Sequence, residues 1–497
     1  MDTSINASYG TTAKHDNDIA RTPSNRNQSA EKAEFHDLVQ PHLRDYCPAS
    51  NLAFNEKVKR MMSEGQEVYH FGFGQAPFPV VPGMVMGLRE YASENAYLPV
   101  AALRGDGTFW LWKCKHVWLV SGIPELREAL CSFHSRYDNL SGLHPDQVIV
   151  GPGSKELIYL LLNVFKGDVF VLSPTWTTYK PQGQLAHHKV YVINTKIENG
   201  WRVQPEDIEK SVIENNVKGN KILVMCNPDN PIFDMWLTGP FLPAGICYMK
   251  EHLEAISDVC RKNNIIVISD EIYARLHYKQ KHDTLARYYP EGTILSSGLS
   301  KWASAGGWRL GYHIYPAELK VLKDAVKSAA SHTYSCAAAP IQYAVAKALN
   351  NEEEIHSYII HTCRILATVA SYCHRELTSV GVKCLPSTAG YYIFPNFELL
   401  RQSLRRRGIT TCDQMCAAMF DEASVALMAG GPAFLRPVDE FTTRLCYVNF
   451  DGKPGLEESL KRGLDHSLDE DFLKTYCKPT YDGIQAIKSW VKAQLEK

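Results

Sequence analysis

The sequence predicts an α/β fold in which a mainly parallel central sheet is flanked by helices. Short apolar runs that are typical of buried strands alternate along the chain with segments of helical periodicity. Residues 264–270 form the clearest run, since Asn-Ile-Ile-Val-Ile-Ser-Asp is apolar almost to its end. A second run, over residues 293–297, leads into a Gly/Ser-rich stretch that contains Lys301. We take this lysine as the centre around which the fold is organised.

The periodicity predicts further elements on either side of this centre. Helices are expected over residues 53–64, 84–94, 317–331, 338–349 and 353–379, and a strand over 390–397. Residues 1–46 are polar and poor in large apolar side chains, so they are expected to be a disordered tail.

The composition narrows the possible partners and compartments. A formal net charge of -1 gives no reason to expect nucleic acid or an anionic membrane as a partner, and no apolar run is long enough to span a bilayer. The first residues lack the basic start and apolar core of a secretory signal. The 14 cysteines form no paired CxxC arrangement, which favours reduced thiols and a cytoplasmic location. Cys412 and Cys416 have no ligand-type neighbours in sequence, so no metal site is expected.

The stretch from Gly298 to Gly311 reads Gly-Leu-Ser-Lys-Trp-Ala-Ser-Ala-Gly-Gly-Trp-Arg-Leu-Gly. A lysine between small residues at the end of a strand is open to a cofactor, and Arg309 can return to the same place to bind an anion. A desolvated lysine near other positive charge has a lowered pKa, which favours the neutral amine needed to form an imine. Taken alone, the stretch also fits a surface lysine and arginine in a flexible loop.

A second glycine-rich segment is suited to binding an anion. Residues 147–150 predict a strand, and Gly151-Pro-Gly153-Ser154-Lys155 then leads into a predicted helix. Such a turn directs free amide groups and the positive end of a helix dipole at its guest. Phosphate is the natural guest for Gly153, Ser154 and Lys155, although strand, glycine turn and helix often form only a tight connection.

The stretch around Lys301 closely resembles the cofactor-binding segment of the class I and II pyridoxal-phosphate (PLP) aminotransferases. Residues matching other motifs of this family follow in the expected order along the chain: Gly153 and Ser154, Trp176, Asn230, Asp270, Tyr273, Lys301 and Arg309. The resemblance extends over roughly residues 50–465. It implies fold type I and a role for each matching residue.

The resemblance implies that PLP forms a Schiff base with Lys301, which then moves the substrate's α-proton as a general base and acid. Asp270 would pair with the pyridine nitrogen and keep the ring an electron sink. Tyr273 and Asn230 would hydrogen-bond the phenolic oxygen, and Trp176 would stack on the ring.

The resemblance also assigns the two anionic groups. Arg309, Ser154 and Ser300 would anchor the phosphate. Gly298 stands where the family often has a hydroxyl, so Ser297 is a second source of that contact. Arg444, on a predicted strand, would bind the substrate carboxylate. The resemblance also implies that two further residues, Gly74 and Asn230, lie near that carboxylate.

The implied activity is transfer of an amino group from an L-amino acid to a 2-oxo acid through pyridoxamine phosphate. The family forms its sites at a dimer interface, so a homodimer is expected, with Tyr97 reaching the neighbour's cofactor phosphate. The implied domains are an N-terminal segment (47–85) that joins the small domain, a large PLP-binding domain (86–335) and a small C-terminal domain (336–497). Aspartate, glutamate, aromatic and kynurenine-like donors all remain open.

Two segments interrupt the family pattern, at residues 102–121 and 232–244. They suggest a catalytically impaired binding or regulatory homologue as one alternative, or translated segments that are normally spliced out as another. A further alternative is a different PLP reaction on the same scaffold, such as a β-lyase or a cyclising synthase, which would share every residue named above.

Overall fold

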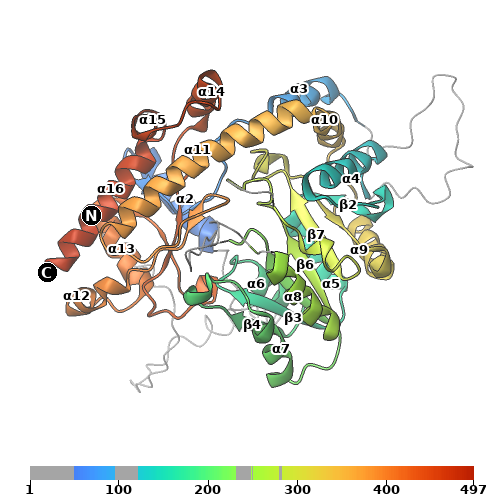
Figure 1. Cartoon of the computed structure of the whole chain (residues 1–497), viewed down its shortest axis with the longest axis horizontal. Helices are drawn as coiled ribbons and strands as arrows, with labels where there is room; N and C mark the ends of the chain where they lie inside the picture. The colour runs from blue at the N-terminus through green and yellow to red at the C-terminus, as the bar shows by residue number, and fades with distance from the viewer. Residues whose placement is uncertain (1–49, 96–120, 231–247, 249, 279–281) are drawn as a thin grey trace, which may run out of the picture. The chain divides into compact units, whose positions relative to one another are not determined.

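The computed structural model describes residues 50–95, 121–230, 248, 250–278 and 282–497 (Figure 1). The tail 1–46, Tyr97, residues 102–120 of the first interruption and all of the second, 232–244, lie outside the described residues. No helix among the described residues is both long and apolar enough to cross a membrane.

Seven strands form the largest sheet, in the order β2-β8-β7-β6-β5-β3-β4. The five strands from β7 to β4 run parallel to one another, whereas β8 is antiparallel to both of its neighbours. The mainly parallel sheet predicted from the sequence is therefore confirmed. The strands are β2 (Val148–Gly151), β3 (Asp168–Ser173), β4 (Val190–Asn194), β5 (Lys221–Cys226), β6 (Ile265–Asp270), β7 (Thr293–Gly298) and β8 (Gly311–Ile314).

Helices cover both faces of this sheet, which explains why its strands are apolar throughout. Within β3, Val169 and Val171 belong to the main core on one face, whereas Phe170 and Leu172 pack on the other face with side chains of α7 and α8. The helices around the sheet are α3 (Pro82–Tyr91), α4 (Pro124–Asp138), α5 (Ser154–Val164), α6 (Tyr179–Leu185), α7 (Pro205–Glu214), α8 (Lys250–Lys262), α9 (Lys320–Ser331) and α10 (Ala339–Leu349).

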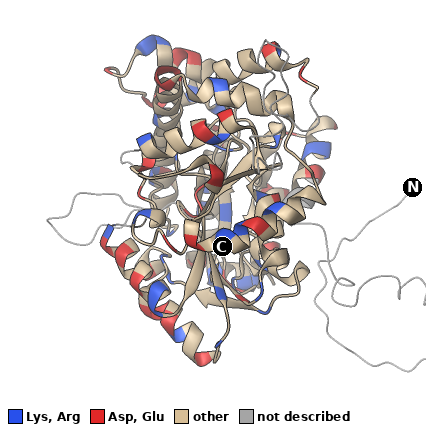
Figure 2. Cartoon of the chain, turned by 90° about the vertical axis from the view of Figure 1, so that its right-hand side faces the viewer, with Lys and Arg blue, Asp and Glu red and all other residues tan. Residues whose placement is uncertain are grey.

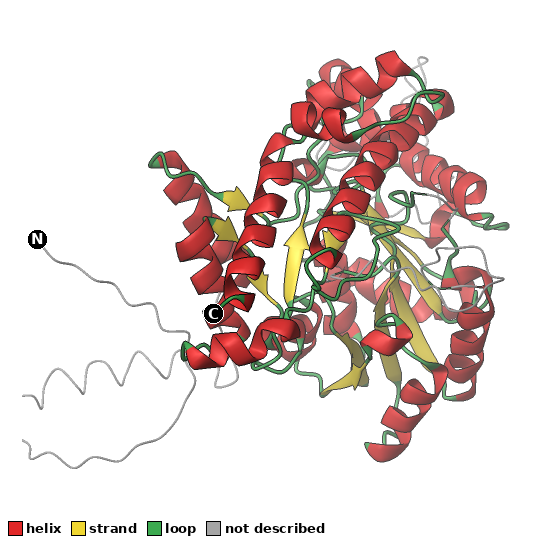
Figure 3. Cartoon of the chain, turned by 60° about the vertical axis from the view of Figure 1, so that its left-hand side comes forward, coloured by secondary structure: helices red, strands yellow, loops and turns green. Residues whose placement is uncertain are grey.

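A second group of elements contains strands of two residues, apart from one strand of four (Figure 3). A three-stranded antiparallel sheet has the order β11-β12-β9, and β1 pairs with β10. The strands are β1 (Tyr69–His70), β9 (Tyr392–Ile393), β10 (Val425–Ala426), β11 (Met428–Ala429) and β12 (Thr443–Cys446). The N-terminal segment thus pairs with the C-terminal third, while the domain boundaries drawn from the sequence stay predictions.

The C-terminal third and the N-terminal helix α2 supply the remaining helices. The long helix α11 extends from the neighbourhood of α10 toward the terminal helices (Figure 1). The helices are α2 (Ser50–Ser63), α11 (Glu352–Thr378), α12 (Arg401–Arg406), α13 (Cys412–Ala423), α14 (Gly452–Arg462), α15 (Glu470–Tyr476) and α16 (Lys478–Leu495). Along these and the other helices, acidic and basic side chains are intermingled (Figure 2).

The predicted helices agree with these bounds to within a few residues, whereas the predicted strand over 390–397 does not. Only Tyr392–Ile393 pairs as a strand, since Gly390 has a φ of 63° and Pro395 cannot donate to a ladder. The short strands therefore position single side chains.

Candidate active site

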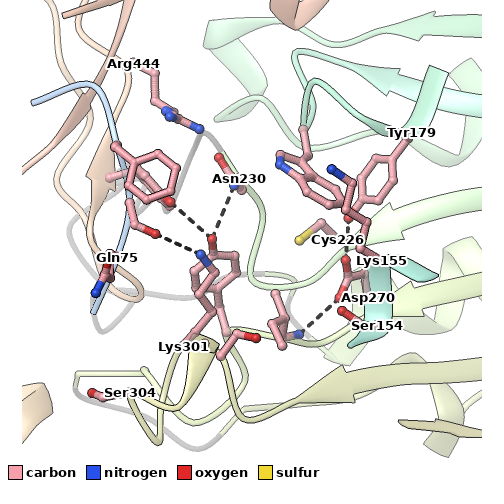
Figure 4. A pocket seen from close by; sticks show the side chains of 18 of the residues that line it. Gln75, Ser154, Lys155, Tyr179, Cys226, Asn230, Asp270, Lys301, Ser304 and Arg444 are labelled. Atoms are coloured by element: carbon pink, nitrogen blue, oxygen red, sulfur yellow. Dashed lines mark hydrogen bonds between the residues drawn. The ribbon is translucent and has the colours of Figure 1, made fainter. Parts of the chain in front are cut away.

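A cavity of about 400 Å³ lies where the carboxyl ends of the large sheet face the small sheet (Figure 4). Eleven of the residues predicted for the site line it: Gly74, Ser154, Lys155, Trp176, Asn230, Asp270, Tyr273, Ser300, Lys301, Arg309 and Arg444. The chain segments that supply them are up to several hundred residues apart, so the fold brings the predicted set together.

Two predicted residues are not part of this lining. Gly153 lies directly behind it, beside Arg309. Ser297 is buried, and its hydroxyl donates to the carbonyl of Glu271 at 3.3 Å. Its side chain is thus engaged by the backbone after β6. Tyr97 lies outside the described residues.

Lys301 follows β7 and extends into the cavity. Its Nζ donates to the carbonyl of Gly74 at 2.9 Å and lies 5.7 Å from the ring centroids of Tyr273 and Tyr391. Burial lowers the pKa of the amine to about 8, assisted by the positive charges of Arg444 and Arg309. A substantial fraction of this amine is therefore neutral and nucleophilic at mildly alkaline pH.

Asp270 ends β6 at the floor of the cavity. The Tyr179 hydroxyl donates to its Oδ2 at 2.7 Å, and the Ile272 amide donates to its Oδ1 at 3.3 Å. Burial raises the pKa of this carboxyl to about 6, although both hydrogen bonds oppose the rise. Above that pH the group is a buried carboxylate, available to a cationic ring nitrogen.

At the start of α5 the backbone packs so closely against its neighbours that it forms a binding site for an anion, which we call the anion cradle. Gly153 precedes the helix with a φ of 104°, and a Cβ there would lie 2.3 Å from Arg309 Nη2. A Cβ at Gly311 would lie 2.2 Å from the Ser154 amide nitrogen. Both positions require glycine. The helix N-terminus, Arg309 and Lys155 together suit a phosphate group, and Lys155 has its pKa lowered by burial and by Arg309.

Trp176 and Tyr179 form one wall beside this cradle. Their rings meet edge to face, with centroids 5.2 Å apart, and Lys155 Nζ lies 5.6 Å from the Trp176 centroid. Trp176 lines the same cavity as Asp270 and Asn230. A flat conjugated ring can stack there.

Arg444, on β12, projects into the cavity from the small sheet. Its Nη2 donates to the Gly72 carbonyl at 2.7 Å and lies 2.9 Å from Met428 Sδ, while its buried Nε has no partner among the described residues. Its guanidinium lies 4.8 Å from the Tyr392 ring centroid. No described carboxylate pairs with this arginine, so its charge is available to an anionic ligand.

The sequence did not identify several residues of the lining, notably Tyr179, Cys226, Gln75 and Tyr392. Tyr179 carries a signal, since it lies three residues after Trp176 at the start of a helix. Tyr392 could have been found only from its pairing in a two-residue strand, which sequence periodicity does not reveal.

Comparisons with known proteins agree with this geometry. The family model for aminotransferase class I and II matches residues 117–232 and 233–451. The aspartate aminotransferase of Thermotoga maritima is 30% identical over 407 residues, covering 80% of this chain and 93% of that protein. The aspartate/prephenate aminotransferase of Thermus thermophilus is 30% identical over 354 residues, covering 70% and 81%.

Solved structures show the same fold. Aspartate aminotransferase from Thermus thermophilus with maleate superposes with a TM-score of 0.68 at 24% identity, covering 85% of this chain and 98% of that one. The Thermotoga maritima enzyme gives 0.66 at 23% identity, covering 91% and 100%. Fold type I is thus confirmed for this chain. The chain belongs to the class I and II aminotransferase family and is a pyridoxal-phosphate-dependent aminotransferase that acts on amino acids and 2-oxo acids.

Proposed function

We propose that Lys301 binds PLP covalently and carries the α-proton of the amino acid during transfer. The observation that carries this proposal is that four features lie in one cavity. They are a lysine of lowered pKa, a buried carboxylate at Asp270, an anion cradle at Ser154 and Arg309, and the unpaired charge of Arg444. Separate structural roles would not require these groups to converge.

The residues present fit the cofactor. When bound, PLP supplies an electron sink for the bond that is broken at the substrate's α-carbon. Ser154, Lys155, Ser300 and Arg309 would hold its phosphate, with the Gly153 turn behind them, and Asp270 would hold its ring nitrogen. Trp176 would stack on the ring, and the buried Asn230 Oδ1, which has no partner among the described residues, lies in the same cavity.

The remaining steps belong to the chain's own residues. Arg444 would orient the α-carboxylate with two parallel hydrogen bonds, in exchange for its bond to the Gly72 carbonyl. Lys301 would remove the α-proton as a general base, which its lowered pKa favours. It would then deliver the proton to the C4′ carbon of the cofactor as a general acid.

The names of the relatives suggest L-aspartate as the first donor to assay, with a 2-oxo acid as the acceptor. We also propose a homodimer in which Tyr97 completes the neighbour's phosphate site. A cytoplasmic location is proposed as well, supported by the eleven cysteines of the described residues, all of which are free thiols.

The test is visible absorption of the purified protein with PLP, before and after addition of single amino acids. We expect a bound-cofactor band that bleaches with a productive donor, and its loss in Lys301→Ala together with at least a roughly 10³-fold loss of transfer. Lys301→Arg is the matched control, because it keeps the charge without a nucleophilic amine. A band that survives in both variants would reject Lys301, and a band that never bleaches would favour another PLP reaction.

A further inference from the structure

Tyr392 places a hydroxyl in the cavity that has no role in the proposed binding and proton-transfer steps. It lies on β9, is 2% exposed and lines the cavity beside Arg444. A Cβ at Gly74 would lie only 1.6 Å from its Oη. The glycine therefore leaves the space that this hydroxyl occupies, and no larger residue at position 74 is compatible with it.

The Tyr392 hydroxyl takes part in a chain of hydrogen bonds. Asn230 Nδ2 donates to Tyr273 Oη at 3.3 Å, and Tyr273 Oη donates to Tyr392 Oη at 3.4 Å. A tyrosine hydroxyl carries a single proton. Tyr273 thus directs its proton at Tyr392, and any other acceptor that enters the cavity has to compete for it.

We propose that Tyr392 is a positioning residue that acts through Tyr273 and sets the pH at which the lysine–cofactor bond takes up its proton. This inference rests on the proposed role of Lys301 and on the role that the family resemblance implies for Tyr273, a hydrogen bond to the cofactor's phenolic oxygen. A hydrogen bond from Tyr273 stabilises negative charge on the cofactor's phenolic oxygen, which then holds the neighbouring proton less tightly. Tyr392 diverts part of that hydrogen bond and so raises the midpoint.

The surroundings of Tyr392 allow the hydroxyl to be removed without disturbing its ring. The Arg444 guanidinium lies over the ring at 4.8 Å, and the Tyr273 ring meets it edge to face at 6.0 Å. Phenylalanine retains both contacts. Tyr392→Phe therefore removes the hydroxyl that accepts from Tyr273 and keeps the ring.

The experiment is a pH titration of the visible absorption of the holoenzyme. We expect Tyr392→Phe to lower the midpoint by roughly half to one pH unit, the size of a single neutral hydrogen bond. In a Tyr273→Phe background the same substitution is expected to cause no shift, because the residue through which it acts is gone.

Tyr391→Phe is the matched control. Tyr391 is also buried, and its ring meets Tyr273 edge to face at 5.8 Å, but its hydroxyl donates to the Gly74 carbonyl at 3.4 Å. It should leave the midpoint within about 0.2 unit, well below the change that one hydrogen bond produces. Should Tyr392→Phe fail to fold, Tyr392→Leu removes the same hydroxyl.

Three results would overturn the inference: an unchanged or higher midpoint in Tyr392→Phe, an equal shift in the Tyr273→Phe background, or an equal shift in Tyr391→Phe. Each leaves the proposed function intact, because the holoenzyme still absorbs and titrates. Absence of a cofactor band in the wild-type protein would instead reject the proposed function itself.

Discussion

The two walls of the cavity are built in different ways. The large-sheet wall, which we define as Ser154, Trp176, Asp270, Lys301 and Arg309, follows strands β2, β3, β6 and β7 of the seven-stranded sheet. The small-sheet wall, defined as Gly74, Tyr392 and Arg444, depends on strands of two to four residues. The first wall is fixed by strand pairings of four to six residues, and the second by pairings of two residues between distant segments.

This difference has a functional meaning if the large-sheet wall holds the cofactor and the small-sheet wall holds the substrate. A cofactor that stays bound benefits from a rigid frame, whereas a substrate has to enter and leave. The comparison can be tested by making equivalent changes in each wall.

The largest contrast is expected from the two arginines. Arg444→Lys should lower kcat/KM for the amino acid roughly 10- to 100-fold and leave cofactor affinity unchanged, because lysine lacks the two-pronged grip on a carboxylate. Arg309→Lys should instead weaken cofactor binding by a similar factor. Absorption titrations with PLP and steady-state kinetics at saturating cofactor measure the two effects. Equal loss of cofactor in both variants would erase the distinction between the walls.

A smaller contrast, about tenfold, is expected from two glycines. Gly153→Ala forces a side chain into a backbone with a φ of 104° and against Arg309, so cofactor affinity should fall. Gly74→Ala meets the Tyr392 hydroxyl, so catalytic efficiency should fall while cofactor affinity is kept. Gly142→Ala serves as the control, because that glycine also has a positive φ of 74° but no atom lies within 4 Å of its Cβ position. A loss of cofactor in Gly74→Ala would contradict the assignment.

The last expected effect is on stability and comes from Asp270. Its pKa of about 6 in the fold exceeds the ordinary value of 3.8, so its ionisation destabilises the apoprotein increasingly as the pH rises through this range. Asp270→Asn should therefore stabilise the apoprotein by on the order of 3 kcal/mol at pH 8 and by about half as much at pH 5. Urea unfolding at both pH values measures this difference. A gain that does not change with pH would exclude the carboxylate charge as its cause.

The same contrast separates what the sequence could predict from what it could not. The strand that ends at Asp270 and the turn at Gly153 are local patterns, in which apolar runs and glycine spacing already define the geometry. Arg444 was predicted only because the strand around it matched a known family. Its hydrogen-bond neighbours come from segments that lie between 16 and 372 residues away in the sequence.

Tyr392 illustrates why such neighbours stay hidden. A buried tyrosine in a short strand has the same sequence signature whether its hydroxyl meets the backbone or a functional group. Asp270 could be recognised from its strand, but the donor at Tyr179, 91 residues away, could not.

The hydrogen bond from Lys301 Nζ to the Gly74 carbonyl joins segments 227 residues apart in the apoprotein. Covalent attachment of a cofactor replaces hydrogens of that amine, so cofactor binding breaks this hydrogen bond. Ordering of the segment around Gly74 and retention of the cofactor are then thermodynamically opposed. Hydrogen exchange at residues 72–75 should accordingly be slower in the apoprotein than after loading, the reverse of the usual tightening that a ligand produces.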